Sequence, residues 1–214
     1  MKKAVLFDID GTIWDSTEGV LKSWNEVLRR HEDAGCQMTL TQLQGYMGKT
    51  ISVIAGLLLP HLPKERALSI MQEAVSCEID YLRLHPGRLY DGIEEVFSIL
   101  SEEYELFIIS NCQNGYIECL LDDYQLHDYF TDCECSGRTG KSKGENIRLV
   151  MERNGITEGV YIGDTQGDLE AAKEAGIPLI FAGYGFGNVN ENVPCADTPE
   201  QIPELVAKGL GKNE

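Results

Sequence analysis

Four aspartates stand at spacings that could place carboxylates around a metal ion. Asp8 and Asp10 lie in the sequence AVLFDIDGT, and Asp164 and Asp168 lie in the sequence VYIGDTQGD. In each sequence a short apolar run ends at the first aspartate. Aspartates in such positions often only cap a turn, but several carboxylates gathered at one place would repel one another without a cation. Because Mg²⁺ prefers a few oxygen ligands, the two segments predict a Mg²⁺ site if the fold brings them together.

An anion would find polar and cationic partners in two other segments. Ser110 ends the apolar run LFIIS, and Asn111 follows it. The stretch CSGRTGKSKGEN, residues 135–146, matches only the second half of the phosphate-binding pattern G-x-x-x-x-G-K-[ST], because Cys135 replaces the first glycine. A damaged nucleotide site is one interpretation of this stretch, and a lysine that binds phosphate in another kind of site is the second.

A capping pattern distinguishes the two lysines of this stretch. Ser142 and Glu145 stand three residues apart before an apolar-periodic run, which predicts that a helix begins here. Lys143 would then lie in the first turn, where the helix dipole disfavours a cation unless an anion is present. The free N–H groups of that turn and the ammonium could bind one phosphate together. We therefore predict Lys143, rather than Lys141, as the phosphate ligand.

The elements that position these residues follow from the pattern of apolar residues. Four short apolar runs, separated by helical patterns, predict buried parallel strands of an α/β sheet. They cover residues 4–8, 106–110, 160–164 and 179–183. Ligands bind beyond the carboxyl ends of such strands, which is where the aspartates and Ser110 stand. Near the end of the chain, Thr198 and Gln201 predict a capping box that opens a final helix to about Leu210.

A long segment between the first two strands predicts a second unit. Residues 15–90 contain no strand-like run, but they contain apolar stripes at helical spacing. One stripe consists of Val20, Trp24, Val27 and Leu28, and another of Ala67, Leu68, Met71, Ala74 and Val75. We therefore predict a helical cap over residues 15–90, inserted into an α/β core made of residues 1–14 plus 91–214.

Composition excludes several classes of function. The formal charge of −17 argues against nucleic-acid binding and against an anionic membrane surface, both of which need clustered cations. No apolar stretch is long enough to span a bilayer, and the first residues lack the apolar run of a signal peptide. The seven cysteines are odd in number and lack a second pair at zinc spacing. They predict structural thiols and a reducing cytoplasm.

The order of these motifs resembles the haloacid dehalogenase superfamily of hydrolases. The resemblance rests on DIDGT at the first strand, a strand-ending Ser110, Lys143 before a helix and GDTQGD at a later strand, and it covers nearly the whole chain. The helical insertion and the segment IGDTQGDLEAAKEAGI are similar to the phosphoglycolate phosphatase and phosphoglucomutase branch. The resemblance implies a Rossmann-like core, a mobile cap and a small phosphorylated metabolite as substrate.

The resemblance also implies a role for each residue. Asp8 would attack phosphorus and form an aspartyl-phosphate, and the Asp10 side chain would act as general acid and base. Mg²⁺ would be held by Asp8, the backbone carbonyl of Asp10 and Asp164. Asp168 would help to hold the lysine or the metal in position. The expected phosphate ligands are Thr12, Ser110, Asn111 and Lys143, and Lys49 in the loop GYMGKT is a candidate for substrate selection or a solvated surface lysine.

Alternative functions differ in how well they fit these residues. A sugar-phosphate mutase needs the same core residues and is the nearest alternative to a phosphatase. A non-catalytic phosphate-binding regulatory module is a further possibility, although the nucleophile and the acid/base pair are intact. The dehalogenase reaction fits less well, because that branch lacks the second aspartate and Asp10 is present. A P-loop NTPase fits worst, because the first glycine is missing and no obvious buried strand precedes the stretch.

Overall fold

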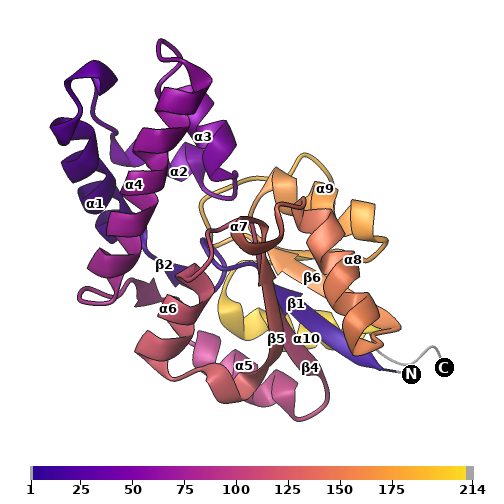
Figure 1. Cartoon of the computed structure of the whole chain (residues 1–214). Coiled ribbons are helices and arrows are strands. Elements are labelled where there is room, and N and C mark those ends of the chain that lie inside the picture. The colour runs from indigo at the N-terminus through magenta and orange to yellow at the C-terminus, as the bar shows by residue number, and fades with distance from the viewer. Residues whose placement is uncertain (1, 211–214) are drawn as a thin grey trace.

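The computed structural model describes residues 2–210, and a parallel sheet lies at its centre (Figure 1). The strand order is β5-β4-β1-β6-β7-β8, and every neighbouring pair is parallel. The strands are β1 (Lys3–Phe7), β4 (Glu105–Ser110), β5 (Phe130–Cys135), β6 (Glu158–Gly163), β7 (Leu179–Ala182) and β8 (Cys195–Ala196). The predicted α/β fold with a Rossmann-like parallel sheet is confirmed. All four apolar runs of the sequence form strands of this sheet.

Helices cover both faces of the sheet because alternate residues of the strands point to opposite sides. In β1, Val5 and Phe7 belong to one apolar cluster, while Ala4 and Leu6 belong to a second cluster. The first cluster includes residues of α5 (Ile93–Ser101), α6 (Tyr116–Tyr124) and α10 (Ile202–Leu210). The second includes residues of α8 (Lys143–Asn154) and α9 (Gln166–Ala175). Both faces of the central strand are therefore buried, as its continuous apolar run requires.

Helices α1 to α4, here called the cap helices, form a group beside the sheet (Figure 1). They are α1 (Thr17–Arg30), α2 (Leu40–Tyr46), α3 (Ile51–Leu58) and α4 (Lys64–Leu82). Their first apolar stripe is buried in α1, from Val20 to Leu28. In α4 the stripe is buried at Ala67, Met71 and Ala74. The prediction that residues 15–90 form a separate cap unit stays a prediction.

Several local predictions were wrong. Residues 15–90 were expected to lack strands, but β2 (Trp14–Asp15) and β3 (Arg88–Leu89) form an antiparallel pair where the chain leaves and rejoins the sheet. The capping box at Thr198 is absent, since the Gln201 side chain accepts a hydrogen bond from the backbone N–H of Asp197. A short 3₁₀ helix, Pro199–Gln201, precedes α10 instead.

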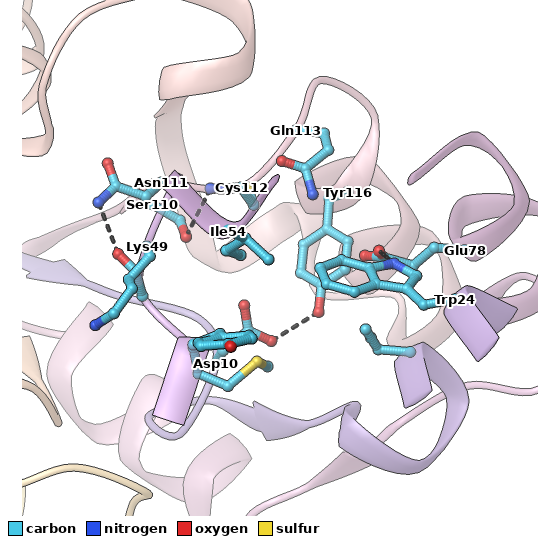
Figure 2. A pocket seen from close by; sticks show the side chains of 14 residues that line it. Asp10, Trp24, Lys49, Ile54, Glu78, Ser110, Asn111, Cys112, Gln113 and Tyr116 are labelled. Atoms are coloured by element: carbon cyan, nitrogen blue, oxygen red, sulfur yellow. Dashed lines mark hydrogen bonds between the residues drawn. The ribbon is translucent and has the colours of Figure 1, made fainter. Parts of the chain in front are cut away.

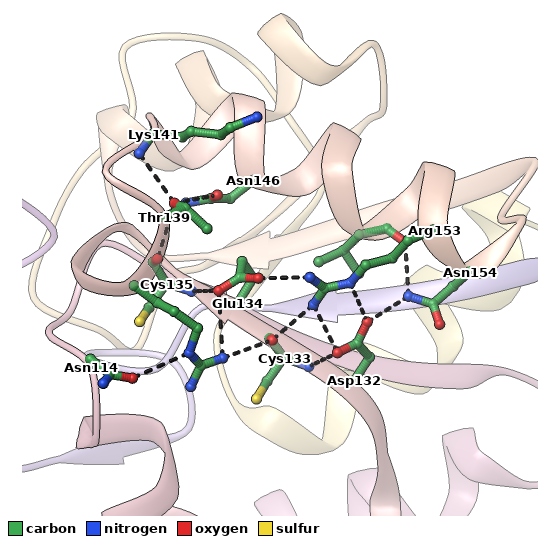
Figure 3. A network of polar contacts seen from close by, with 12 residues as sticks. Asn114, Asp132, Cys133, Glu134, Cys135, Thr139, Lys141, Asn146, Arg153 and Asn154 are labelled. Atoms are coloured by element: carbon green, nitrogen blue, oxygen red, sulfur yellow. Dashed lines mark hydrogen bonds and ion pairs between the residues drawn. The ribbon is translucent and has the colours of Figure 1, made fainter.

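Strand β5 was also missed, and it precedes the lysine-containing stretch. Its sequence FTDCEC is polar, and Arg138 and Arg153 form ion pairs with its acidic side chains. Figure 3 shows the contacts of Arg153. Arg153 of α8 donates to Asp132 at 2.6 and 2.8 Å and to Glu134 at 2.7 Å. A strand therefore does precede GRTGKS, but it lies at the edge of the sheet and only its last two residues are buried. The segment after β5 forms the short helix α7 (Ser136–Thr139) rather than a phosphate-binding loop.

Among residues 2–210, no helix combines the length and the apolar character that crossing a membrane requires.

Candidate active site

The strand order brings the predicted residues to one edge of the sheet. Strand β1 lies between β4 and β6, so residues that follow these three strands are neighbours in space. Asp8 follows β1, Ser110 ends β4, and Asp164 follows β6. Strands of this kind present their carboxyl ends at the same edge. The three segments therefore converge as the sequence predicted.

A buried cluster of carboxylates and one lysine lies at this edge. Carboxylate oxygens of Asp8, Asp164 and Asp168 all lie within 4.8 Å of one another. Lys143 Nζ lies 2.9 Å from Asp8 Oδ2 and donates to Asp168 Oδ1 at 2.6 Å. All four side chains are buried. One cation thus contacts two of three neighbouring carboxylates, which leaves the cluster short of positive charge.

The predicted capping box explains why Lys143, and not Lys141, reaches this cluster. Ser142 Oγ accepts from the backbone N–H of Glu145, and the Glu145 side chain accepts from the N–H of Ser142, so α8 begins at Lys143. Lys141 lies outside the helix and is exposed. The prediction that Lys143 lies in the first turn is confirmed. Burial lowers the pKa of Lys143, but the two carboxylates outweigh burial and raise it above its usual range.

Asp168 uses both of its oxygens within the protein. Its Oδ1 accepts from Lys143, and its Oδ2 accepts from the backbone N–H and the hydroxyl of Thr165 at 2.9 and 2.7 Å. The Thr165 hydroxyl accepts in turn from the N–H of Asp168, which completes a capping box at the start of α9. Asp168 therefore has the contacts of a residue that holds Lys143 in place.

Asp8 and Asp164 each have one oxygen without a partner. Asp8 Oδ1 and Asp164 Oδ1 are buried and accept no hydrogen bond from residues 2–210. Buried carboxylate oxygens without partners are costly and rare. Burial raises the pKa of Asp8 to about 7 and raises that of Asp164 well above its usual range. Two unpaired, hard oxygen donors in one acidic cluster are the ligands that Mg²⁺ prefers, so the residues present fit this ion.

A glycine-rich loop that the sequence analysis left without a role holds Asp164. The N–H groups of Phe186 and Gly187 donate to Asp164 Oδ2 at 2.7 and 3.3 Å. Gly11 has a φ of +77°, and a Cβ there would lie 2.1 Å from the same oxygen. Only glycine fits this turn, which explains the glycine of DIDGT. The Gly-rich sequence after β7 was the available signal for the loop.

Asp10 forms no ion pair with Lys143 and accepts hydrogen bonds from two hydroxyl groups. Tyr116 Oη donates to Asp10 Oδ1 at 2.7 Å, and Ser16 Oγ donates to the same oxygen at 3.2 Å. Burial raises the pKa of Asp10, while these hydrogen bonds lower it. A carboxyl group with a raised pKa keeps its proton to a higher pH than usual, which suits it to proton transfer. The sequence analysis missed Tyr116 and Ser16, because neither belongs to a motif.

Asp10 also lines a cavity of about 40 Å³ between the cap helices and the strand ends (Figure 2). Ser110, Asn111 and Lys49 line the same cavity, and Lys49 is exposed. Asn111 Nδ2 donates to the carbonyl of Gly48 at 2.8 Å, so it joins the core to the loop that carries Lys49. Thr12 is fully buried, and its hydroxyl has no partner among the described residues.

Comparison with known proteins identifies the family. The family model of haloacid dehalogenase-like hydrolases matches residues 5–182. The chain belongs to this family. The resemblance drawn from the sequence, including the phosphoglycolate phosphatase-like branch, is thereby confirmed, as is the expectation of a phosphatase-type hydrolase.

Curated relatives and solved structures extend over almost the whole chain. A phosphoglycolate phosphatase of Vibrio vulnificus (strain YJ016) is 24% identical, with 98% of this chain and 93% of the relative covered. One of Xanthomonas campestris pv. campestris (strain 8004) is 26% identical, with 95% and 94% covered. A crystal structure described as a predicted phosphatase from Clostridium acetobutylicum is 26% identical, with a TM-score of 0.80 and coverage of 99% and 100%. A haloacid dehalogenase-like hydrolase from Streptococcus pneumoniae shares the fold at 20% identity and a TM-score of 0.81, with 95% and 97% covered.

Proposed function

We propose that this hydrolase is a Mg²⁺-dependent phosphatase that acts on a small phosphomonoester through an aspartyl-phosphate on Asp8. The observation that carries the proposal is the pair of buried, unpartnered oxygens on Asp8 and Asp164 beside Lys143. The curated relatives named phosphoglycolate phosphatase support a small phosphate ester as substrate. The seven free cysteines support a reducing cytoplasm as its location.

The residues around the cluster would have separate roles in binding the metal ion and the phosphate. Asp8, the backbone carbonyl of Asp10 and Asp164 would hold Mg²⁺, which would offset the repulsion between the Asp8 carboxylate and the phosphate dianion. Lys143 is held by Asp168 so that its ammonium lies beside the nucleophilic carboxylate. The expected phosphate ligands are Lys143 together with Thr12, Ser110 and Asn111.

Asp10 would transfer protons in both halves of the reaction. In the first half, Asp8 attacks phosphorus, the bond to the leaving oxygen breaks, and Asp10 gives its proton to that oxygen. In the second half, Asp10 takes a proton from the water that attacks the aspartyl-phosphate, which releases free phosphate and restores Asp8. The hydroxyl groups of Tyr116 and Ser16 keep the Asp10 carboxyl group in one position. Proton transfer of this kind contributes roughly 10²–10⁴ in rate.

A direct test of the covalent step distinguishes the role of Asp8 from the role of Asp10. With acetyl phosphate and Mg²⁺, Asp8→Asn should neither release phosphate nor gain a phosphoryl group, because an amide is not a competent nucleophile. Asp10→Asn should still be phosphorylated, because acetate leaves without protonation, but should release phosphate slowly. Intact-mass spectrometry and a free-phosphate assay report the two steps.

Two further measurements define the reaction. A chelator should stop phosphate release by the wild-type protein, and added Mg²⁺ should restore it. Turnover by Asp8→Asn at the wild-type rate would refute the covalent mechanism. Transfer of phosphate between sugar positions without release of free phosphate would instead indicate the mutase.

A further inference from the structure

The cap helices place a second carboxyl group in the cavity beside Asp10. Glu78 of α4 is only 2% exposed and lines this cavity (Figure 2). The indole N–H of Trp24 donates to Glu78 Oε2. No other residue in the range 2–210 forms a hydrogen bond or an ion pair with the Glu78 side chain. Its second oxygen is therefore free for a group that enters the cavity.

No cationic side chain among residues 2–210 forms an ion pair with this carboxyl group. Val20 and Ile54 are apolar neighbours that line the same cavity. Burial raises the pKa of Glu78 to about 8, so the group is mostly neutral at neutral pH. A neutral carboxyl can accept the Trp24 hydrogen bond on one oxygen and donate from the other. Such a group suits a hydroxyl, which both donates and accepts.

The cavity also limits the size and the charge of a leaving group. Its volume of about 40 Å³ has room for about three water-sized groups, since one such group needs about 10–15 Å³. Lys49 is the only cationic side chain among the described residues that line it. Figure 2 shows Lys49 on the other side of Asp10 from Glu78. A carboxylate beside Glu78 would therefore lose its water without gaining a cation, which is unfavourable.

We propose that Glu78 is a specificity residue that binds a hydroxyl group of the leaving alcohol, so that the preferred substrates are monophosphates of small uncharged polyols. Esters with a carboxylate near the phosphate are disfavoured. The inference rests on the proposed phosphatase function and narrows its substrate class. Glu78 would thus contact the leaving alcohol, which is the part of the substrate that receives the proton from Asp10.

Matched pairs of substrates test the proposal. Glycerol 3-phosphate is compared with 3-phosphoglycerate, and 2-hydroxyethyl phosphate with phosphoglycolate, because each pair exchanges a terminal hydroxymethyl group for a carboxylate. The wild-type kcat/KM should be about tenfold or more higher for the hydroxyl member, which corresponds to one well-formed hydrogen bond. Glu78→Ala should lower this ratio severalfold, mainly through KM, because the hydroxyl loses its partner while the carboxylate still gains no cation. Glu78→Gln should keep the ratio, because the amide also donates and accepts.

Controls separate this inference from the proposed function. Glu65→Ala, an exposed change near the start of the same helix, should leave the ratio at its wild-type value. If wild-type protein hydrolyses acetyl phosphate but favours the carboxylate member, or 2-aminoethyl phosphate, the inference is wrong and the phosphatase remains. If acetyl phosphate is not hydrolysed at all, the proposed function fails. Should Glu78→Ala not fold, the wild-type ratio and the Glu78→Gln ratio still decide.

Discussion

Replacing Glu78 by glutamine should change how stability depends on pH. Burial raises the Glu78 pKa from 4.5 to about 8, against the opposing hydrogen bond from Trp24. Below pH 4.5 the group is protonated in both states, so it costs nothing. Between these values the unfolded chain releases a proton that the folded protein keeps, so the free energy of unfolding falls by about 1.4 kcal/mol per pH unit as pH rises. Glutamine does not titrate, so the unfolding free energy of Glu78→Gln does not fall for this reason as the pH rises.

Chemical denaturation at several pH values measures the effect. The stability of Glu78→Gln relative to wild type should rise by about 3–4 kcal/mol between about pH 5 and about pH 8. A constant Mg²⁺ concentration is needed, because the other buried carboxylates then titrate alike in both proteins and cancel in the difference. Glu65→Gln, an exposed change on the same helix, should follow the wild-type curve. Parallel curves for wild type and Glu78→Gln would refute the claim that this carboxyl group is buried and neutral.

Four further substitutions test the site. Lys143→Met leaves two buried carboxylates without their cation, so it should cost about 3–5 kcal/mol of unfolding free energy and abolish phosphate release. Lys141 is exposed, so Lys141→Met should change neither the unfolding free energy nor phosphate release. A loss with Lys141→Met and none with Lys143→Met would reverse the assignment. Tyr116→Phe removes a hydrogen bond that lowers the Asp10 pKa, so the alkaline limb of the kcat/KM profile should move to higher pH, and an unmoved limb would exclude the contact. Lys49→Ala should reorder a panel of phosphate esters while acetyl phosphate hydrolysis persists, and an unchanged order would leave Lys49 as a surface residue.

The sequence predicted those parts of the fold that local physical chemistry determines. Continuous apolar runs gave the central strands, because both faces of such strands are buried. The start of α8 followed from Ser142 and Glu145, since a capping box involves only neighbouring residues. Strand β5 was not predicted because its acidic residues are neutralised by Arg138 and Arg153, which both follow the strand in the chain. Nothing within FTDCEC signals these partners.

The candidate site divides in the same way. Asp8 and Asp164 could be placed together because they follow adjacent strands. Tyr116 reaches Asp10 across 106 residues, and its sequence neighbours carry no motif. The N–H of Phe186 also contacts Asp164, but any residue except proline could supply a backbone donor. Tertiary contacts of these kinds leave no local pattern, so only the folded structure could reveal them.

Asn111 joins the core to the loop around Gly48 at the edge of the cavity, so it would link phosphate binding to the predicted closure of the cap. Its Oδ1 accepts from Ser136 Oγ at 2.7 Å, and this fixes the Nδ2 group that bonds to the Gly48 carbonyl. A primary amide carries two N–H groups, so the second can serve a phosphate oxygen. Phosphate affinity and cap closure would then be thermodynamically linked, each strengthening the other by the same free energy. Asn111→Asp, which keeps the shape but loses the donors, should weaken the binding of inorganic phosphate and speed amide hydrogen exchange in the loop around Gly48, two effects that no change at this position could separate.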